Sequence, residues 1–410
     1  MLHEDALIAT LALSLAFAFM FGLAAVQLRL PPLVGYLLAG IALSPYTPGL
    51  VADTHLAPQL AEIGVMLLMF GVGTHFSLRD LMAVKALAIP GALAQILVAT
   101  ALGMCAAHFW GWTFGTGVLF GLALSVASTV VLLRALEQQG TLATEEGRIA
   151  VGWLVVEDLV TVLALVLLPA LAGVLGGEAP PGLAASPGST LWHPLAATLG
   201  KVALFVALML IVGARVFPWI LRHAVRTQSR ELFTLAAVAL ALGVAFGAAK
   251  LFGVSVALGA FFAGMVISGS DHSHSAAHYL QPLQDTFAAL FFVAVGMLFE
   301  PEVLVRHPLE VLEVLAIIVL GKSLAAFLIV RLLGRPLSTA LTVSAALAQI
   351  GEFSFILAVM GVAMKVLPPE GQSYIVAGAL LSIVLNPMVF VLLGRLRPAA
   401  ASRSERPLGS

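Results

Sequence analysis

The chain has 410 residues, of which 61% are hydrophobic and 10% are charged, and its mean hydropathy is +1.07. A soluble domain carries about 25% charged residues because its folded surface must be solvated. This composition therefore excludes an ordinary soluble protein and predicts an integral membrane protein surrounded by lipid. The net charge of −1 gives no reason to expect a nucleic-acid partner, and the single cysteine, Cys105, excludes an intrachain disulfide.

A bilayer core needs roughly 20 apolar residues per helix, and thirteen apolar segments between charged residues and Pro/Gly breaks are candidate spans. The second and third are short, and a merged or split helix would change the count by one. The expected fold is an all-α polytopic membrane protein with about 13 transmembrane helices. The first segment lacks a basic flank and a clear cleavage site, so it is expected to be retained. The predicted spans are residues 5–27, 31–44, 58–74, 83–108, 115–136, 146–175, 196–223, 230–250, 253–269, 281–299, 309–333, 337–363 and 371–394.

Basic residues mark the cytoplasmic side of a membrane protein. With thirteen spans and the N-terminus outside, 15 of the 20 lysines and arginines fall inside and four outside, leaving Lys322 within the membrane. This asymmetry predicts a cytoplasmic C-terminus. The longest loop, about 177–193, contains no lysine or arginine and is expected outside, whereas residues 396–410 are expected to form a cytoplasmic tail.

The two halves of the transmembrane domain, residues 1–395, resemble each other. Residues 35–44 (GYLLAGIALS) match residues 259–268 (GAFFAGMVIS) at an offset of 224. Residues 67–73 (LLMFGVG) match residues 290–296 (LFFVAVG) at an offset of 223. Seven spans separate the copies, so the second copy is predicted to be inverted in the membrane. The expected repeats are spans 1–6, about 5–175, and spans 8–13, about 230–394, with 196–223 as the linker helix.

Glu157 and Asp158 lie side by side in the otherwise apolar segment 151–168. A charge at a helix centre costs about 2.5–3.5 kcal/mol on insertion scales, and such residues mark ion or proton pathways. Glu157 lies about 16 Å beyond Glu146 at 1.5 Å per residue, which places the pair near the midplane. The alternative is that both carboxylates lie near the cytoplasmic end and are simply hydrated.

The other deep charge is Lys322, and a buried ammonium needs an anionic partner. Adjacent helical residues point about 100° apart, so Glu157 and Asp158 cannot both face this lysine squarely. One carboxylate is expected to pair with Lys322 while the other faces the cavity. A purely structural Glu–Lys pair is the alternative.

Polar residues interrupt two apolar segments at positions related by the offset of 223. They predict two broken, crossing helices, whose unwound backbone and opposed helix ends ligate or balance an ion. The alternative is that serine, threonine and glycine serve helix packing. The supporting residues are Ser125, Ser128 and Thr129 in the first segment and Gln349, Gly351 and Glu352 in the second.

Other polar features are expected to have ordinary roles. Residues 271–278 contain three histidines but are expected to form a hydrated linker, and no metal site is predicted beyond that of the transported cation. Asn386-Pro387 is expected to kink the last helix. Glu62 and Asp285 are repeat-related acids near helix starts, where the helix dipole favours them.

Seven segments occur in a specific order and spacing over roughly residues 5–395. They are LPPLVGYLLAG (30–40), EIGVMLLMFGVG (62–73), SVASTVVLLRAL (125–136), GWLVVEDLV (152–160), LFFVAVGMLF (290–299), GKS (321–323) and AQIGEFSFIL (348–357). Together they resemble the cation:proton antiporter-2 superfamily and, within it, the Kef-type potassium/proton antiporters of bacteria.

The resemblance implies a homodimer in the bacterial inner membrane, with a core domain that moves like an elevator against a dimerisation domain. It implies that Asp158 takes a proton or a cation in turn, and that Glu157 pairs with Lys322. The implied function is monovalent cation/proton antiport by alternating access, of K⁺ or alternatively Na⁺, and not an enzymatic activity. No cofactor is expected in this chain.

The sequence departs from the glutathione-gated members in two ways. Those members carry glutamine before the aspartate, whereas this chain has Glu157, so cation choice, stoichiometry and gating stay open. They also continue into a cytoplasmic nucleotide-binding domain. This chain ends about fifteen residues after its last predicted helix, and no GxGxxG follows a strand, so that regulatory domain is expected to be missing.

Antiport needs one site that cannot hold both ions, and a carboxylate in a cavity provides it because protonation removes the charge that attracts the cation. Asp158 is expected to be this site, with Ser125, Ser128 and Thr129 as candidate co-ligands. Two other functions stay open: a gated cation channel or uniporter without obligatory proton coupling, and an organic-solute symporter, which needs a roomier site.

Overall fold

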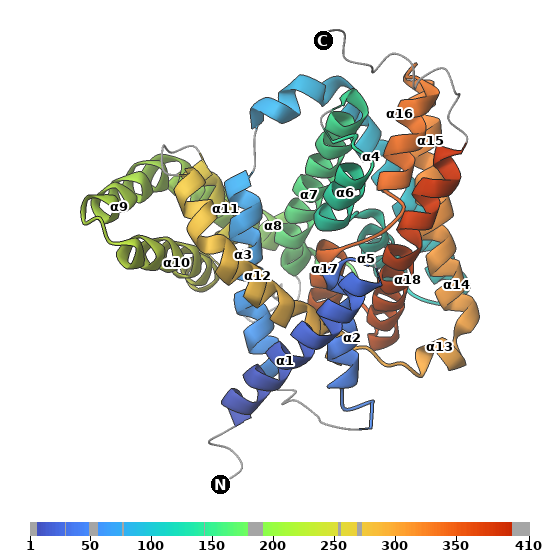
Figure 1. The fold of residues 1–410 in the computed structure, drawn as a ribbon, viewed down its shortest axis with the longest axis horizontal. Helices are drawn as coiled ribbons and strands as arrows, with labels where there is room; N and C mark the ends of the chain where they lie inside the picture. The colour runs from blue at the N-terminus through green and yellow to red at the C-terminus, as the bar shows by residue number, and fades with distance from the viewer. Residues whose placement is uncertain are drawn as a thin grey trace. The chain divides into compact units, whose positions relative to one another are not determined.

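A computed structural model describes most of the chain, and all regular elements in the described part are helical (Figure 1). The described residues are 6–28, 30–48, 56–75, 78–142, 144–178, 192–252, 256–268 and 273–395. Most of the predicted external loop, the predicted tail 396–410 and residues 271 and 272 of the histidine segment lie outside these ranges.

Each of the thirteen predicted spans falls on a helix or on helical segments in succession. Eight helices are long and apolar enough to cross a membrane, and six shorter apolar helices accompany them in the described part of the chain. These observations confirm an all-helical, multi-pass architecture. The number of helices that cross the bilayer stays a prediction, because length and composition alone do not establish each crossing.

The helices form two compact units. The first unit comprises residues 1–78, 160–307 and 355–376. Within it, α3 packs against α11 and α12, and α9, α10 and α11 lie side by side (Figure 1). Its helices are α1 (Ala6–Gln27), α2 (Pro32–Ala42), α3 (Leu56–His75), α8 (Trp192–Leu208), α9 (Ala214–Arg226), α10 (Arg230–Gly247), α11 (Val256–Ser268), α12 (Ser273–Met297) and α13 (Val303–Arg306), with π-helical segments η1 (Met209–Gly213) and η2 (Ala248–Phe252).

The second unit comprises residues 79–159, 308–354 and 377–410. Its helices are α4 (Leu78–Phe109), α5 (Phe114–Ser125), α6 (Thr129–Gln138), α14 (Pro308–Ala316), the π-helical segment η3 (Ile317–Gly321), α15 (Lys322–Leu332) and α16 (Leu337–Ala346). Three helices contribute several residues to each unit: α7 (Glu145–Leu171), α17 (Glu352–Ala363) and α18 (Pro369–Gly394). The first residue of α4, Leu78, also belongs to the first unit. All nine predicted site residues belong to the second unit.

In the first unit, α2 and α12 approach each other closely at Gly40 and Gly296. A side chain on Gly40 would overlap the carbonyl oxygen of Val293, and one on Gly296 would overlap that of Leu37. Only glycine permits this approach, because its lack of Cβ lets two backbones touch.

The same contact occurs a second time, between α3 and α11. A side chain on Gly264 would overlap the carbonyl oxygen of Phe70, and one on Gly73 would overlap that of Phe261. Adding 224 to 40 and 37 gives 264 and 261, and adding 223 to 73 and 70 gives 296 and 293. The two contacts are therefore equivalent under the sequence offset, as expected if the two halves are repeats of one structure.

The second unit contains both predicted helix breaks. Residues 126–128 separate α5 from α6, and residues 347–351 separate α16 from α17. Adding 223 to 126–128 gives 349–351, which lies within the second break. Both breaks are thus present at the positions that the polar residues and the repeat predicted.

Candidate functional site

The first break leaves backbone groups that side chains from α4 and α7 satisfy. Val126 and Ser128 adopt extended backbone conformations, which interrupt the helical hydrogen-bond ladder. Oε2 of Glu157 accepts a hydrogen bond of 2.8 Å from the Ala127 N–H. A carboxylate suits this position because the start of α6 exposes N–H groups and the positive end of the helix dipole.

The Ser125 carbonyl group, at the end of α5 just before the first break, is bound by a neutral side chain. Nε2 of Gln95 donates a hydrogen bond of 3.1 Å to the Ser125 carbonyl oxygen at the end of α5. Oε1 of Gln95 in turn accepts from the Trp153 indole at 3.4 Å. Trp153 lies four residues before Glu157 on α7, so both side chains project from the same face of that helix.

At the second break the charged partner of the backbone is a cation instead of a carboxylate. Nζ of Lys322 donates to the Gln349 carbonyl oxygen at 3.2 Å. Nδ2 of Asn386 donates to the Ala345 carbonyl oxygen at 2.9 Å. An ammonium suits this place because the last turn of α16 exposes carbonyl oxygens and the negative end of its dipole.

The Gln349 side chain joins the two breaks. The Ser128 N–H donates to Oε1 of Gln349 at 2.9 Å, and Nε2 of Gln349 donates to the Ser128 carbonyl oxygen at 3.2 Å. Nε2 also lies 3.3 Å from the Ala346 carbonyl oxygen. Gly351 completes the contact because a side chain there would overlap Ser128. The two unwound segments therefore cross in direct contact.

Hydroxyl groups connect the crossing further. The Ser128 hydroxyl donates to Oε2 of Glu352 at 3.1 Å, at the start of α17, where the helix dipole stabilises a carboxylate. The Ser354 hydroxyl donates to the Ala123 carbonyl oxygen at 2.6 Å. These contacts tie the first turn of α17 to the end of α5 and the first break.

Glu157 and Lys322 form the predicted contact, with Oε2 and Nζ 3.9 Å apart and both side chains fully buried. Each group also binds the backbone of a break, so the pair satisfies two helix ends and its own opposite charges at once. Burying two charges is tolerated only when they are paired and hydrogen-bonded. The contact is present, and its part in transport stays a prediction.

The Asp158 carboxylate makes weaker contacts with the protein than the Glu157 carboxylate does. Asp158 is 8% exposed, and its Oδ2 accepts from the Thr129 hydroxyl at 3.4 Å. Its Oδ1 has no hydrogen-bond partner among the described residues. The two adjacent carboxylates therefore differ: Glu157 is fully buried and engaged by an ion pair and a backbone N–H, whereas Asp158 keeps some exposed surface and has one long contact to a hydroxyl. Helix geometry predicted that only one of the two would face Lys322 squarely.

The three predicted co-ligand hydroxyls do not all converge on Asp158. Only that of Thr129 contacts this carboxylate. The Ser125 hydroxyl donates to the Leu122 carbonyl oxygen of its own helix at 2.7 Å, and the Ser128 hydroxyl turns toward Glu352. In this arrangement both serines stabilise the breaks, and their role as ion ligands stays a prediction.

Sequence reasoning missed Gln95, Trp153 and Ser354, and it interpreted Asn386 as part of a proline kink. Asn386 is buried and holds the end of α16. A signal was present for the two amides, because each interrupts a long apolar stretch of its helix. Their partners could not be read from sequence spacing, because each partner lies on a different helix.

The buried groups of the second unit carry a formal excess of negative charge. Glu157, Asp158 and Glu352 are carboxylates and Lys322 is a cation, so the formal charge with all four ionised is −3 + 1 = −2. Glu157 and Glu352 both interact electrostatically with Asp158. Such a cluster favours binding of protons or cations, which reduce the charge. Within the described residues, no group of three or more His, Cys, Asp or Glu side chains is arranged to hold a metal ion.

Two crossing broken helices around buried, ionisable groups define a membrane transporter of the secondary type. The model of the protein family described as "Sodium/hydrogen exchanger, transmembrane" matches residues 13–395 of this chain. The chain therefore belongs to the sodium/hydrogen exchanger family, a family of membrane cation/proton antiporters, which confirms the resemblance inferred from the motifs.

Individual relatives agree with this assignment. The chain is 58% identical over 406 residues to the putative cation/proton antiporter YbaL of Escherichia coli (strain K12), covering 99% of this chain and 72% of that protein. It is 30% identical over 382 residues to the glutathione-regulated potassium-efflux system protein KefC of Salmonella typhi, covering 93% of this chain and 59% of that protein. The chain thus spans less than two thirds of the KefC relative.

A solved structure shares the fold. The sodium proton antiporter MjNhaP1 from Methanocaldococcus jannaschii superposes with a TM-score of 0.69, covering 95% of this chain and 98% of that chain. The sequences are only 17% identical, so this likeness supports the architecture alone.

Proposed function

We propose that this chain is the membrane part of a K⁺/H⁺ antiporter, with Na⁺ as the alternative cation, and that Asp158 is the site of exchange. The observation that carries the proposal is the difference between the two adjacent carboxylates. Glu157 is fully buried, accepts from the Ala127 N–H at 2.8 Å and lies 3.9 Å from the Lys322 ammonium, whereas Asp158 is 8% exposed and contacts the Thr129 hydroxyl at 3.4 Å.

Competition at Asp158 provides the coupling. A deprotonated carboxylate attracts a monovalent cation, and protonation removes that attraction, so cation and proton exclude each other at one site. Thr129 orients the carboxylate through Oδ2, and carbonyl oxygens near the break are further candidate ligands. Alternating access then carries either ion across, because the loaded site opens to one side at a time.

Glu157 and Lys322 support this site in the proposed mechanism. They fix the ends of the two breaks and so hold Thr129 and Asp158 in their relative positions. In an alternative mechanism, deprotonation of Lys322 contributes to coupling. The double variant Glu157→Gln/Lys322→Met separates the two roles. If the pair only supports the site, this neutral pair should retain coupled exchange. If Lys322 must release a proton during transport, the double variant should lose coupling.

The two compact units would have different roles in alternating access. The second unit would act as the moving core and the first unit as the dimerisation domain of a homodimer, with inverted repeats related by the offset of about 223. The proposed location is the bacterial inner membrane, with the N-terminus outside and the C-terminus cytoplasmic. A cytoplasmic nucleotide-binding domain is the proposed regulatory partner, because the KefC relative is glutathione-regulated and longer than this chain.

The decisive experiment is cation-dependent proton flux in proteoliposomes, measured with a pH-sensitive dye for K⁺, Na⁺, Li⁺ and choline. The wild type should exchange protons for K⁺ or Na⁺ and not for choline. Asp158→Asn should abolish the exchange, because an amide neither binds a cation by charge nor takes up a proton. Full exchange by this variant would overturn the assignment of Asp158.

Asp285→Asn is the matched control. Asp285 is an exposed aspartate of α12, outside the cluster around the breaks. This variant should keep the exchange rate of the wild type. An equal loss in both variants would indicate damage to folding rather than loss of the exchange site. Flux that ignores an imposed pH gradient but follows voltage would favour the channel instead.

A further inference from the structure

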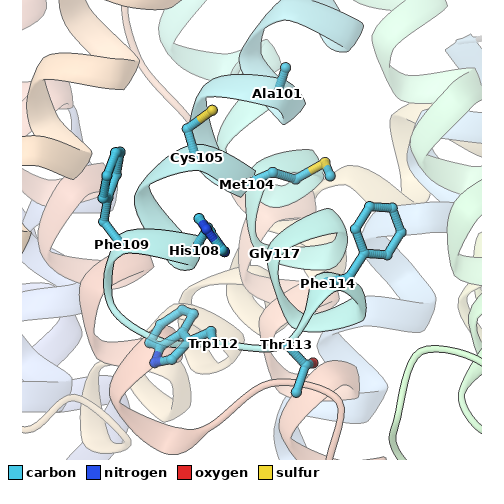
Figure 2. A pocket seen from close by; sticks show the side chains of 9 residues that line it. All are labelled: Ala101, Met104, Cys105, His108, Phe109, Trp112, Thr113, Phe114 and Gly117. Carbon is cyan, nitrogen blue, oxygen red and sulfur yellow. The ribbon is translucent and has the colours of Figure 1, made fainter.

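A pocket lies in the second unit, away from the crossing of the breaks, between the C-terminal turns of α4 and the start of α5. Its volume is about 420 Å³. One side consists of Ala101, Cys105 and His108, which follow each other along one face of α4 (Figure 2). Phe114 and Gly117 of α5 contribute to the lining.

The pocket is apolar apart from one end. The other lining residues are Met104, Phe109, Trp112 and Thr113, and Figure 2 shows Trp112 and Thr113 at the end opposite Ala101. The Thr113 hydroxyl is already engaged, because it shares a hydrogen bond of 2.9 Å with the Thr116 hydroxyl. The His108 imidazole is the other polar side chain of a lining that is otherwise mostly apolar, so the lining favours a hydrocarbon ligand over a polar one.

The surface around the pocket is one that lipid covers in a membrane protein. Phe109 and Phe114 are 85% and 75% exposed, and Leu97 on α4 is 70% exposed. Exposure of these large apolar side chains beside an apolar hollow would be costly in water. Trp110 and Trp112 pack edge to face at the same end of α4, and indoles gather where the bilayer meets water.

We propose that this pocket binds one acyl chain of a bilayer phospholipid. The chain would run along α4 from Trp112 past His108 toward Ala101, with the headgroup at the end that Trp112 and Thr113 line. The volume lies in the range of about 300–1,000 Å³ typical of small-ligand pockets. Burial of hydrocarbon supplies the affinity, at about 0.8 kcal/mol for each buried methylene group. This site is independent of the exchange site at Asp158.

Cys105 gives a direct readout, because it lines the pocket, is exposed and is the only cysteine of the chain. The rate of its reaction with N-ethylmaleimide is measured on the full chain in detergent, with and without dioleoylphosphatidylethanolamine. At lipid concentrations of about ten times Kd, the reaction should slow about tenfold, because only the unoccupied fraction reacts. Glycerophosphoethanolamine, which has the headgroup without acyl chains, should give no protection.

The matched control moves the thiol outside the pocket. In the variant Cys105→Ser/Leu97→Cys, the thiol lies on the same helix at an exposed position that does not line the pocket. Its reaction rate should change little with added lipid. Equal protection of both thiols would overturn the proposal, since it would show general coverage by the micelle.

A second variant fills the pocket. Ala101 is exposed on α4, so the larger side chain of Ala101→Phe should occupy part of the pocket without disturbing a packed interior. The ratio of the Cys105 reaction rates without and with lipid should fall toward one. Protection of the wild type that persists in this variant, no protection of the wild type, or protection by glycerophosphoethanolamine would each contradict an acyl-chain site.

Discussion

The two broken helices are built alike but are held by opposite charges. At the first break, Glu157 accepts from a backbone N–H and Gln95 donates to a carbonyl. At the second break, Lys322 and Asn386 both donate to carbonyls. Each break thus has one charged and one neutral partner, and each charge matches the helix end that it faces.

The comparison of the two breaks indicates which negative charge remains available to bind an ion. Glu157 and Lys322 lie 3.9 Å apart and balance each other, so the pair contributes no net charge. Asp158 is next to Glu157, and its hydrogen-bond contact is with Thr129, the first residue of α6, although the Glu352 carboxylate of the second break also interacts with it electrostatically. The first break is therefore the candidate for ion binding, and the second for support. Four predictions test this division.

The largest effect is expected for the charged pair. Lys322→Met leaves Glu157 charged and buried without its cation, which typically costs about 3–5 kcal/mol of stability. The double variant Glu157→Gln/Lys322→Met should regain most of the loss, because it removes both charges together. Unfolding free energies of the single and double variants in mixed detergent micelles form the test. A double variant as unstable as Lys322→Met would show that the two residues are not coupled.

A smaller loss is expected where the breaks meet. Gln349→Leu leaves the Ser128 N–H and carbonyl without their partners, at about 1–3 kcal/mol for each unsatisfied buried group. Gln372→Leu is the control, because Gln372 is also buried and its Nε2 has no hydrogen-bond partner among the described residues. Thermal unfolding in detergent should separate the two variants clearly. Equal destabilisation would contradict a special role for Gln349.

The sequence predicted the breaks well because their cause is local. Polar residues and glycine within apolar helices mark an interrupted hydrogen-bond ladder, and the offset of 223 related Ser128 to Gly351, which are in contact. That one of the two carboxylates would contact Lys322 was also predictable, because a buried charge needs a countercharge, but the choice of Glu157 came from the family resemblance. The partners of Gln95 and Asn386 were not, because an amide can bond to any nearby backbone group and only tertiary packing selects it.

These two amides allow the breaks to be compared directly. Gln95→Leu and Asn386→Leu each remove one hydrogen bond to a break carbonyl, so each should cost about 1 kcal/mol of stability. Transport should distinguish them. Gln95→Leu loosens the break beside Asp158 and should raise the KM for the cation more than Asn386→Leu does. A larger rise for Asn386→Leu would place the ion at the second break.

The smallest effect is expected from the hydroxyl that touches the proposed exchange site. Thr129→Val keeps the shape of the side chain but removes the donor 3.4 Å from Oδ2 of Asp158. One hydrogen bond contributes about 0.5–1.5 kcal/mol, so the KM for the cation should change by roughly 2–10-fold. Ser125→Ala is the matched control, because its hydroxyl donates within its own helix and its KM should stay unchanged. If Ser125→Ala changed the KM and Thr129→Val did not, the hydroxyl that serves the ion would be the one at the end of α5, and Asp158 would bind its cation from the other side of the break.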